Sequence, residues 1–526
     1  MQPALQIGFS ARRHWLAAAA LGLLPGLAAA QVSVTTWHNH NLRDGQNTHE
    51  AILTPANVNS TSFGKLFSYA LDAALYAQPL YLPNVSIPGE GTHNVVYVAT
   101  EKNSVYAFDA DGLVTTPLWR VSLSLSGESP GHCTKLADIC IASGLPLGVT
   151  STPVIDPTSN TIYVLSMTRQ TNGTYIDRLH ALDVTTGAEK FGGPVVIQAT
   201  VAGTGAGSVG GMITFDAVHQ LQRPGLLLLN GTVYLAWGAL AQQQPWHGWV
   251  MAYNATTLAQ TAVLNDSPNG TQGGIWESGG GLAADPAGNI YLQTGDGTFD
   301  ANAGGLEYGD SFLKLSGALA VEDYFTPYNQ GIFFNDDLDV GGGAGIILPT
   351  QTGPYPHEIV GADKQGNIYL VDRDAMGGYG ANQNTNIQTV TGSVDGYINS
   401  PAYWNGAVYL SGNNDHLSRY TLKNGLLSTA PVSKSANILV QGSTPSISSN
   451  GTTNGIVWAI DLGSSLKQPC VLRAYNALNL AQQLYNSNQA GMRDRPGDGI
   501  AFTTPTIVNG KVYIGTATQL DVYGLL

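Results

Sequence analysis

The segments Ser151-Thr-Pro-Val-Ile155, Thr161-Ile-Tyr-Val-Leu165 and Arg178-Leu-His-Ala-Leu-Asp183 decide the fold. Apolar and polar residues alternate within them, and β-branched and aromatic residues are frequent, which is typical of strands. Asn-Gly, Asp-Gly and Thr-Gly pairs bound such segments and predict tight turns. The same three-strand unit, with a tyrosine near the end of its second strand, recurs along the chain. Its eight copies begin at Gln78, Ser151, Arg223, Gly279, Gly343, Ser400, Ser443 and Thr504.

A sheet of this kind cannot bury both faces alone, so neighbouring sheets must stack around an axis. The last copy, which begins at Thr504, ends the chain after its third strand. A spare N-terminal strand at about residues 63–71 can supply the missing outer strand and close the ring without an exposed edge. We therefore predict an all-β protein with one domain over residues 31–526. It is an eight-bladed β-propeller of four-stranded antiparallel blades, closed by that strand.

The composition agrees with such a protein. The chain has 526 residues, of which 64 are glycine, 43% are hydrophobic and only 11% are charged. Abundant glycine suits many tight turns, and the hydrophobic share excludes an acidic disordered chain. The formal net charge of −14 argues against a nucleic-acid partner, because phosphates require a basic face.

Residues 1–30 have the pattern of a secretory signal. Arg12 and Arg13 precede an apolar run from Trp15 to Leu27, and small residues follow up to Ala30. This pattern predicts cleavage near Ala30 and a secreted or periplasmic protein, by either the general or the twin-arginine route. The run is too short for a membrane anchor, and no later apolar stretch is long enough, so we expect no membrane span.

Three cysteines occur in the chain. In an oxidising compartment Cys133 and Cys140 can close a small loop as a disulfide, which leaves Cys470 unpaired. There is no Cys-x-x-Cys-His sequence, so the chain has no motif for attaching a c-type haem. A redox activity would therefore need a separate electron acceptor.

In a propeller, the loops that enter the inner strands share one rim of a central funnel with the loops that join the second and third strands. Residues remote in sequence meet there. The rim would gather acidic side chains suited to a hard cation, and basic ones such as Arg223 suited to an anionic ligand. We expect a small-molecule or carbohydrate ligand in this funnel.

The repeats, especially Ser104-Val-Tyr-Ala-Phe-Asp109 and Arg178-Leu-His-Ala-Leu-Asp183, resemble those of the quinoprotein alcohol dehydrogenases, which use pyrroloquinoline quinone (PQQ) and Ca²⁺. The resemblance covers nearly the whole mature chain. It implies that Asp339, in Asp337-Leu-Asp339, is the catalytic base and a metal neighbour. It implies that Lys364 approaches the quinone oxygens, and that Asp296 takes the place of a calcium-binding asparagine.

The sequence also departs from that family. Gln243 stands where the family has a calcium-binding glutamate, and Gly279 stands where it has the tryptophan beneath the quinone. Trp276 or Trp246 would have to supply that stacking surface. The family's disulfide between adjacent cysteines corresponds by loop to Cys133 and Cys140.

Three functions are compatible with these residues. The first is a PQQ- and Ca²⁺-dependent alcohol or sugar dehydrogenase with a degenerate cofactor site. The second is a propeller that binds a ligand, a glycan or a protein and performs no chemistry. The third is a polysaccharide lyase or hydrolase, in which Arg223 would bind a uronate. The sequence leaves open whether the protein is an enzyme.

Overall fold

The computed structural model describes residues 1, 2, 4, 31–133, 135, 139, 140, 143–462 and 468–526. The predicted signal peptide lies almost entirely outside the described residues. Residues Val32–Leu526 form one compact unit. Among the described residues, no helix is both long and apolar enough to cross a membrane.

The unit is a ring of eight antiparallel sheets, as the repeats predict. The first four blades are β3 (Leu80–Ile87), β4 (Gly91–Ala99), β5 (Ser104–Asp109) and β6 (Trp119–Ser122); β9 (Val154–Asp156), β10 (Thr161–Arg169), β11 (Tyr175–Asp183) and β12 (Val195–Val196); β16 (Leu227–Leu229), β17 (Thr232–Ala239), β18 (Trp249–Asn254) and β19 (Gln260–Asn265); and β20 (Ala283–Ala284), β21 (Ile290–Gln293), β22 (Phe312–Leu315) and β23 (Val321–Thr326).

The last four blades continue in chain order. They are β24 (Ile346–Ile347), β25 (Glu358–Ala362), β26 (Ile368–Asp372) and β28 (Gln388–Val390); β29 (Ala402–Trp404), β30 (Ala407–Leu410), β31 (Asp415–Lys423) and β33 (Ser433–Leu439); β34 (Ser446–Asn450), β35 (Thr453–Asp461), β36 (Val471–Asn476) and β37 (Asn479–Asn486); and β38 (Thr506–Val508), β39 (Lys511–Gly515) and β40 (Gln519–Leu525), completed by β2 (Phe63–Ala70).

Further short elements extend the blades or connect them. They are β1 (Gln46–Asn47), β7 (Ser129–His132), β8 (Pro146–Leu147), β13 (Thr200–Ala202), β14 (Met212–Thr214), β15 (Gln220–Leu221), β27 (Gly378–Tyr379), β32 (Leu426–Leu427), α1 (Gln330–Asp336), η1 (Glu277–Gly279), η2 (Ala301–Ala303) and η3 (Gly491–Asp494).

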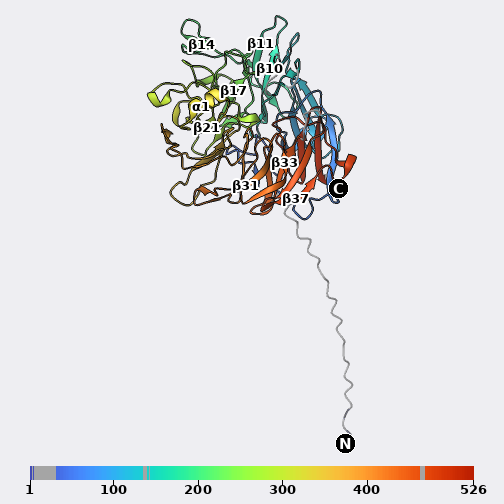
Figure 1. Ribbon diagram of the computed structural model, residues 1–526. Coiled ribbons are helices and arrows are strands. Elements are labelled where there is room, and N and C mark those ends of the chain that lie inside the picture. The colour runs from blue at the N-terminus through green and yellow to red at the C-terminus, as the bar shows by residue number, and fades with distance from the viewer. Residues whose placement is uncertain (3, 5–30, 134, 136–138, 141–142, 463–467) are drawn as a thin grey trace. The chain divides into compact units, whose positions relative to one another are not determined.

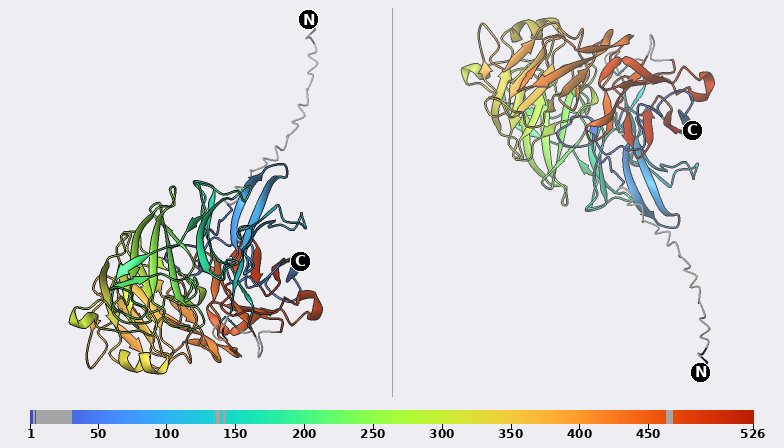
Figure 2. Two further views of the ribbon diagram at one scale, coloured as in Figure 1. Left: turned by 90° about the horizontal axis from the view of Figure 1, so that it is seen from above. Right: turned by 90° about the horizontal axis from the view of Figure 1, so that it is seen from below.

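The N-terminal strand closes the ring as predicted. β2 pairs antiparallel with β40 from Phe63 opposite Leu525 to Ala70 opposite Gln519. In Figures 1 and 2 the blades follow one another in colour order, and the first, blue blade lies beside the last, red one. Phe63 is fully buried and its ring centroid lies 4.9 Å from that of Tyr485. The closure therefore has a packed core as well as a strand ladder.

The tyrosine that recurs in the second strand joins neighbouring blades. The Tyr97 hydroxyl donates a hydrogen bond to the Val184 carbonyl in the next blade. Tyr163 in turn donates to Ala255. The same link recurs from Tyr234 to Gly317, from Tyr409 to Ala477 and, across the closure, from Tyr513 to Ala110. A buried phenol needs a partner, so this repeat fixes how adjacent blades pack.

Candidate functional site

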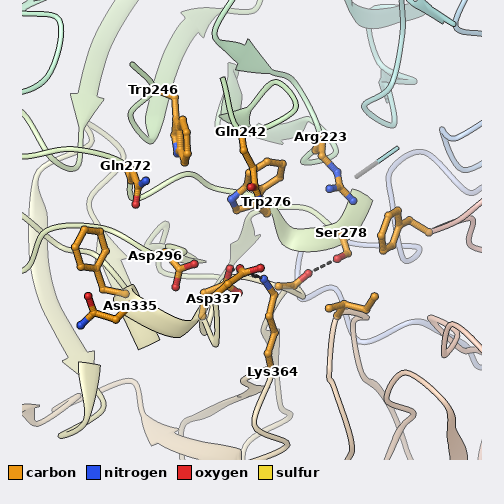
Figure 3. Close-up of a pocket in the computed structure, with 15 residues that line it drawn as sticks. Arg223, Gln242, Trp246, Gln272, Trp276, Ser278, Asp296, Asn335, Asp337 and Lys364 are labelled. Carbon is orange, nitrogen blue, oxygen red and sulfur yellow. Dashed lines mark hydrogen bonds and ion pairs between the residues drawn. The ribbon is translucent and has the colours of Figure 1, made fainter. Parts of the chain in front are cut away.

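Loops from several blades surround one cavity of about 430 Å³. Figure 3 shows its labelled side chains converging on a common space. The lining residues are Arg223, Gln242, Trp246, Gln272, Trp276, Ser278, Asp296, Phe334, Asn335, Asp337, Asp339, Gly342, Lys364, Ile398 and Phe502. Of the predicted site residues, Arg223, Trp276, Asp296, Asp339 and Lys364 all line this cavity.

Three carboxylates form a cluster on one side of the cavity. Asp296 follows β21, Asp337 ends α1 in a left-handed conformation, and Asp339 lies two residues further on. One oxygen from each lies within 4.8 Å of the others. Gly341 lets this segment approach the chain just after β21 closely, because a Cβ there would lie 2.6 Å from the Gly295 nitrogen.

Lys364 lies against this cluster. It follows β25, and its Nζ lies 2.5 Å from Asp337 Oδ1 and 3.0 Å from Asp339 Oδ2. The Lys364 backbone N–H also donates to the Asp339 carbonyl. Burial lowers the pKa of Lys364, but Asp339 and Asp337 raise it more, so the net shift is upward and the ammonium stays charged.

The cluster has more carboxyl groups than one lysine could balance if all of them were ionised. Asp296 Oδ1, Asp339 Oδ1 and Asp310 Oδ1 are buried and have no hydrogen-bond partner among the described residues. Burial, followed by repulsion from Asp339, raises the pKa of Asp296 to about 8. Burial also raises the pKa of Asp339, although Lys364 acts in the opposite direction. Carboxylate oxygens arranged in this way suit a divalent cation, which would favour their ionised forms.

Aromatic rings and a guanidinium form another wall of the cavity. The Arg223 guanidinium carbon lies 4.4 Å from the ring centroid of Phe502 and 5.5 Å from that of Trp276. The Trp276 ring packs against the chain at Gly238, where a Cβ would lie 2.9 Å from it. Arg223 is 3% exposed, so this cation is desolvated and its aromatic contacts are correspondingly strong.

Gln243 lies elsewhere: the cavity is lined by its neighbour Gln242. Ala241 and Gln242 both have positive φ angles, so the loop turns at a point that spacing alone does not reveal. Cys133 and Cys140 form a disulfide, but they do not line this cavity, and Cys133 instead contributes to a separate, more apolar one. Cys470 is free and buried.

Several lining residues were not predicted from the sequence. Phe502 comes from the loop before β38, and a Cβ on Gly279 would lie 3.7 Å from its Cβ. Phe334 and Asn335 come from the short helix α1. Gln242 and Gln272 add two amides. Phe502 stands just before the repeat that begins at Thr504. An aromatic residue at that place is the one sequence signal that could have predicted an aromatic side of the cavity.

No protein-family model matches the chain, and no curated protein matches it. Solved structures match it over most of its length. A quinohemoprotein alcohol dehydrogenase from Comamonas testosteroni is 14% identical, with a TM-score of 0.60, over 94% of this chain and 81% of that chain. The chain has the fold of such dehydrogenases.

Two further structures agree with this likeness. A quinohemoprotein alcohol dehydrogenase from Pseudomonas putida HK5 is 13% identical, with a TM-score of 0.59, over 94% of this chain and 80% of that chain. A europium-containing methanol dehydrogenase is 11% identical, with a TM-score of 0.61, over 94% of this chain and 98% of that chain. At these identities the likeness concerns the fold, and any common chemistry has to be argued from the site.

Proposed function

We propose that the protein is a dehydrogenase that uses PQQ and a divalent cation to oxidise a hydroxyl group of a sugar or polyol in this cavity. One observation carries the proposal. Asp296, Asp339 and Lys364 were each assigned from a separate motif, and they come from different parts of the chain. All three nevertheless line one cavity, in a cluster where Asp296 Oδ1 and Asp339 Oδ1 have no hydrogen-bond partner among the described residues.

The residues that line the cavity suit both the divalent cation and PQQ. Asp296, Asp337 and Asp339 would hold the cation, because Ca²⁺ prefers carboxylate oxygens. Arg223 and Lys364 would bind the anionic quinone, and the Trp276 indole offers an aromatic surface beside it. When bound, PQQ supplies the oxidant for a two-electron oxidation, and Ca²⁺ supplies a Lewis acid.

Asp339 is the residue placed to accept the proton of the substrate hydroxyl. It is 4% exposed, it borders the cavity, and Oδ1 has no partner among the described residues. Burial raises its pKa and Lys364 opposes that shift, so Lys364 favours the ionised form that a base requires. Activity should therefore rise with pH as the Asp339 carboxyl loses its proton.

The rest of the lining favours a substrate with several hydroxyl groups. Two indoles, Trp246 and Trp276, face the same space as the amides of Gln242 and Gln272 (Figure 3). Sugar rings pack their C–H faces on aromatic rings, and amides both donate to and accept from hydroxyls. A purely apolar pocket would suit a simple alcohol better than this lining does.

The test has two stages. Terbium(III), a luminescent substitute for Ca²⁺, should bind the cluster and emit on excitation of the nearby tryptophans, and Ca²⁺ should compete. Protein loaded with PQQ and Ca²⁺ should then reduce an artificial electron-accepting dye when given aldoses or polyols. Asp339→Asn should abolish dye reduction, while Asp216→Asn, on the exposed surface, should not. Absence of both terbium binding and a melting-temperature rise with PQQ and Ca²⁺ would refute the proposal.

Carbohydrate binding without turnover is the second candidate function. It is favoured by the pairing of Lys364 with Asp337 and Asp339 and by the stacking of Arg223 on Phe502, which leave both cations already engaged. Sugar binding by calorimetry, together with no dye reduction by PQQ-loaded protein, would support this alternative.

A further inference from the structure

An N-terminal segment of the chain runs along the inner strands of the ring. The segment Val34–Asn47, here called the axial segment, precedes the closing strand and forms hydrogen bonds with every blade. It contacts the inner strands in chain order. Its partners are Tyr81, Ile155, Leu226 and Leu228, Ala284, Ile347, Tyr403, Ile447 and Ile507, from the first blade to the eighth.

Arg43 is the cation of this segment. It is fully buried, and its guanidinium donates hydrogen bonds in four directions. Two bonds stay within the segment, from Nη1 to Thr36 Oγ1 at 2.6 Å and to the Trp37 carbonyl at 2.9 Å. Two leave it, from Nε to the Leu282 carbonyl at 2.9 Å and from Nη2 to the Leu226 carbonyl at 3.1 Å.

The two outer bonds reach the loops that form the cavity wall. Leu226 lies three residues after Arg223, and Leu282 lies six residues after Trp276. These loops also contact each other, because the Gly225 N–H donates to the Gly280 carbonyl. Arg43 therefore ties together the chain segments that bring Arg223 and Trp276 side by side.

The same loop continues to the carboxylate cluster. The Glu277 N–H donates to the Gly341 carbonyl, and the Ser278 hydroxyl donates to the Gly342 carbonyl. These acceptors lie two and three residues after Asp339. Glu277 is itself fully buried, and its Oε2 has no hydrogen-bond partner among the described residues. Burial raises the pKa of Glu277 to about 8, and Arg43 acts in the opposite direction.

We infer that Arg43 is a positioning residue for the cavity, although it is not among the residues that line it. It holds the Arg223 and Trp276 loops at a fixed separation and, through Glu277 and Ser278, fixes the segment that carries Asp339. The inference rests on the proposed cation and ligand site. It adds that the N-terminal axial segment is part of the apparatus that shapes the site.

The experiment compares terbium affinity in the full-length mature protein and three variants. Arg43→Met removes the charge and all four hydrogen bonds, whereas Arg43→Lys keeps the charge. Arg120→Met makes the same side-chain change at a control site, because Arg120 is a half-exposed arginine of β6 that pairs with Asp72. Residues that orient metal ligands typically change metal affinity by 10- to 100-fold when they are altered. Arg43→Met should weaken terbium binding about 10-fold or more, Arg43→Lys should weaken it less, and Arg120→Met should leave it unchanged.

All affinities are measured at a temperature where circular dichroism shows each variant folded. A lower melting temperature with unchanged terbium affinity in Arg43→Met would mean a merely structural role and would overturn the inference. If Arg43→Met does not fold, Thr36→Val removes the acceptor 2.6 Å from Arg43 Nη1, together with the bond that the Thr36 hydroxyl donates to the Leu226 carbonyl. Its affinity should then fall, and unchanged affinity would again overturn the inference. Absence of terbium binding in the wild type would instead refute the proposed function.

Discussion

Glu101 provides a quantitative test of burial in this ring. It is 1% exposed, and its oxygens accept hydrogen bonds from the Gly148 N–H at 2.7 Å and the Thr150 hydroxyl at 2.8 Å. Burial raises its pKa from 4.5 to about 7, and the two hydrogen bonds only partly oppose this shift. The folded protein therefore keeps a proton that the unfolded chain has lost across this pH range.

The sign of the effect on stability follows from this difference. Below pH 4.5 the carboxyl is protonated in both states, so it has no linked cost there. As the pH rises to about 7, the unfolded chain is stabilised by ionisation and the folded chain is not. Each pKa unit corresponds to about 1.4 kcal/mol, so the free energy of unfolding should fall by about 3 kcal/mol from this group.

The assay compares wild type with Glu101→Gln by urea unfolding at half-unit steps from pH 4 to pH 8. Glutamine keeps the shape of the protonated side chain and can donate to the Thr150 hydroxyl. The stability of the variant relative to wild type should rise by about 3 kcal/mol across the range. Glu322→Gln, at an exposed position, should show no such rise. A flat difference for Glu101→Gln would show that the carboxyl is hydrated and that the reasoning is wrong.

Three further predictions test the closure, the cluster and the blade contacts. Phe63→Ala should lower the free energy of unfolding by about 3–5 kcal/mol, because a fully buried ring is lost from the closing strand; a loss below about 1 kcal/mol in urea would contradict this packing. Gly341→Ala should abolish terbium binding with an unchanged circular dichroism spectrum, because its Cβ would lie 2.6 Å from the Gly295 nitrogen; normal binding would contradict the close approach. Tyr163→Phe should cost about 1 kcal/mol by leaving the Ala255 carbonyl unpaired; urea unfolding with no change would argue against that bond.

Much of the fold could be predicted because its unit repeats. Eight copies of one strand pattern specify eight blades, and the incomplete last copy specifies a closing strand near Phe63. The role of the recurring tyrosine could not be predicted in the same way. Its position in a strand follows from the alternating pattern, but its hydroxyl bonds to a carbonyl in the next blade, as Tyr163 does with Ala255.

The candidate site was predictable only where motifs survive. Asp296, Asp339 and Lys364 were assigned in register with known segments, and all three line the cavity. The prediction for Gln243 missed by one position: Gln242 lines the cavity instead, because Ala241 and Gln242 have positive φ angles that redirect the loop. Phe502 could not be predicted, because the loop before the last inner strand reaches Arg223 only once the ring is closed.

The axial segment shows why a repeat cannot specify the centre of a ring. The inner strand of each blade has one edge facing the axis, and its backbone groups there need partners. The axial segment meets most of these edges in the same way, with backbone carbonyls that accept from inner-strand N–H groups, from Tyr81 in the first blade to Ile447 in the seventh. Backbone carbonyls are common to all residue types, so the sequence of this segment carries little signal of its role. The axial segment also connects all the blades to one another. Through these connections a fully buried residue such as Arg43 can hold the loops that line the cavity in place.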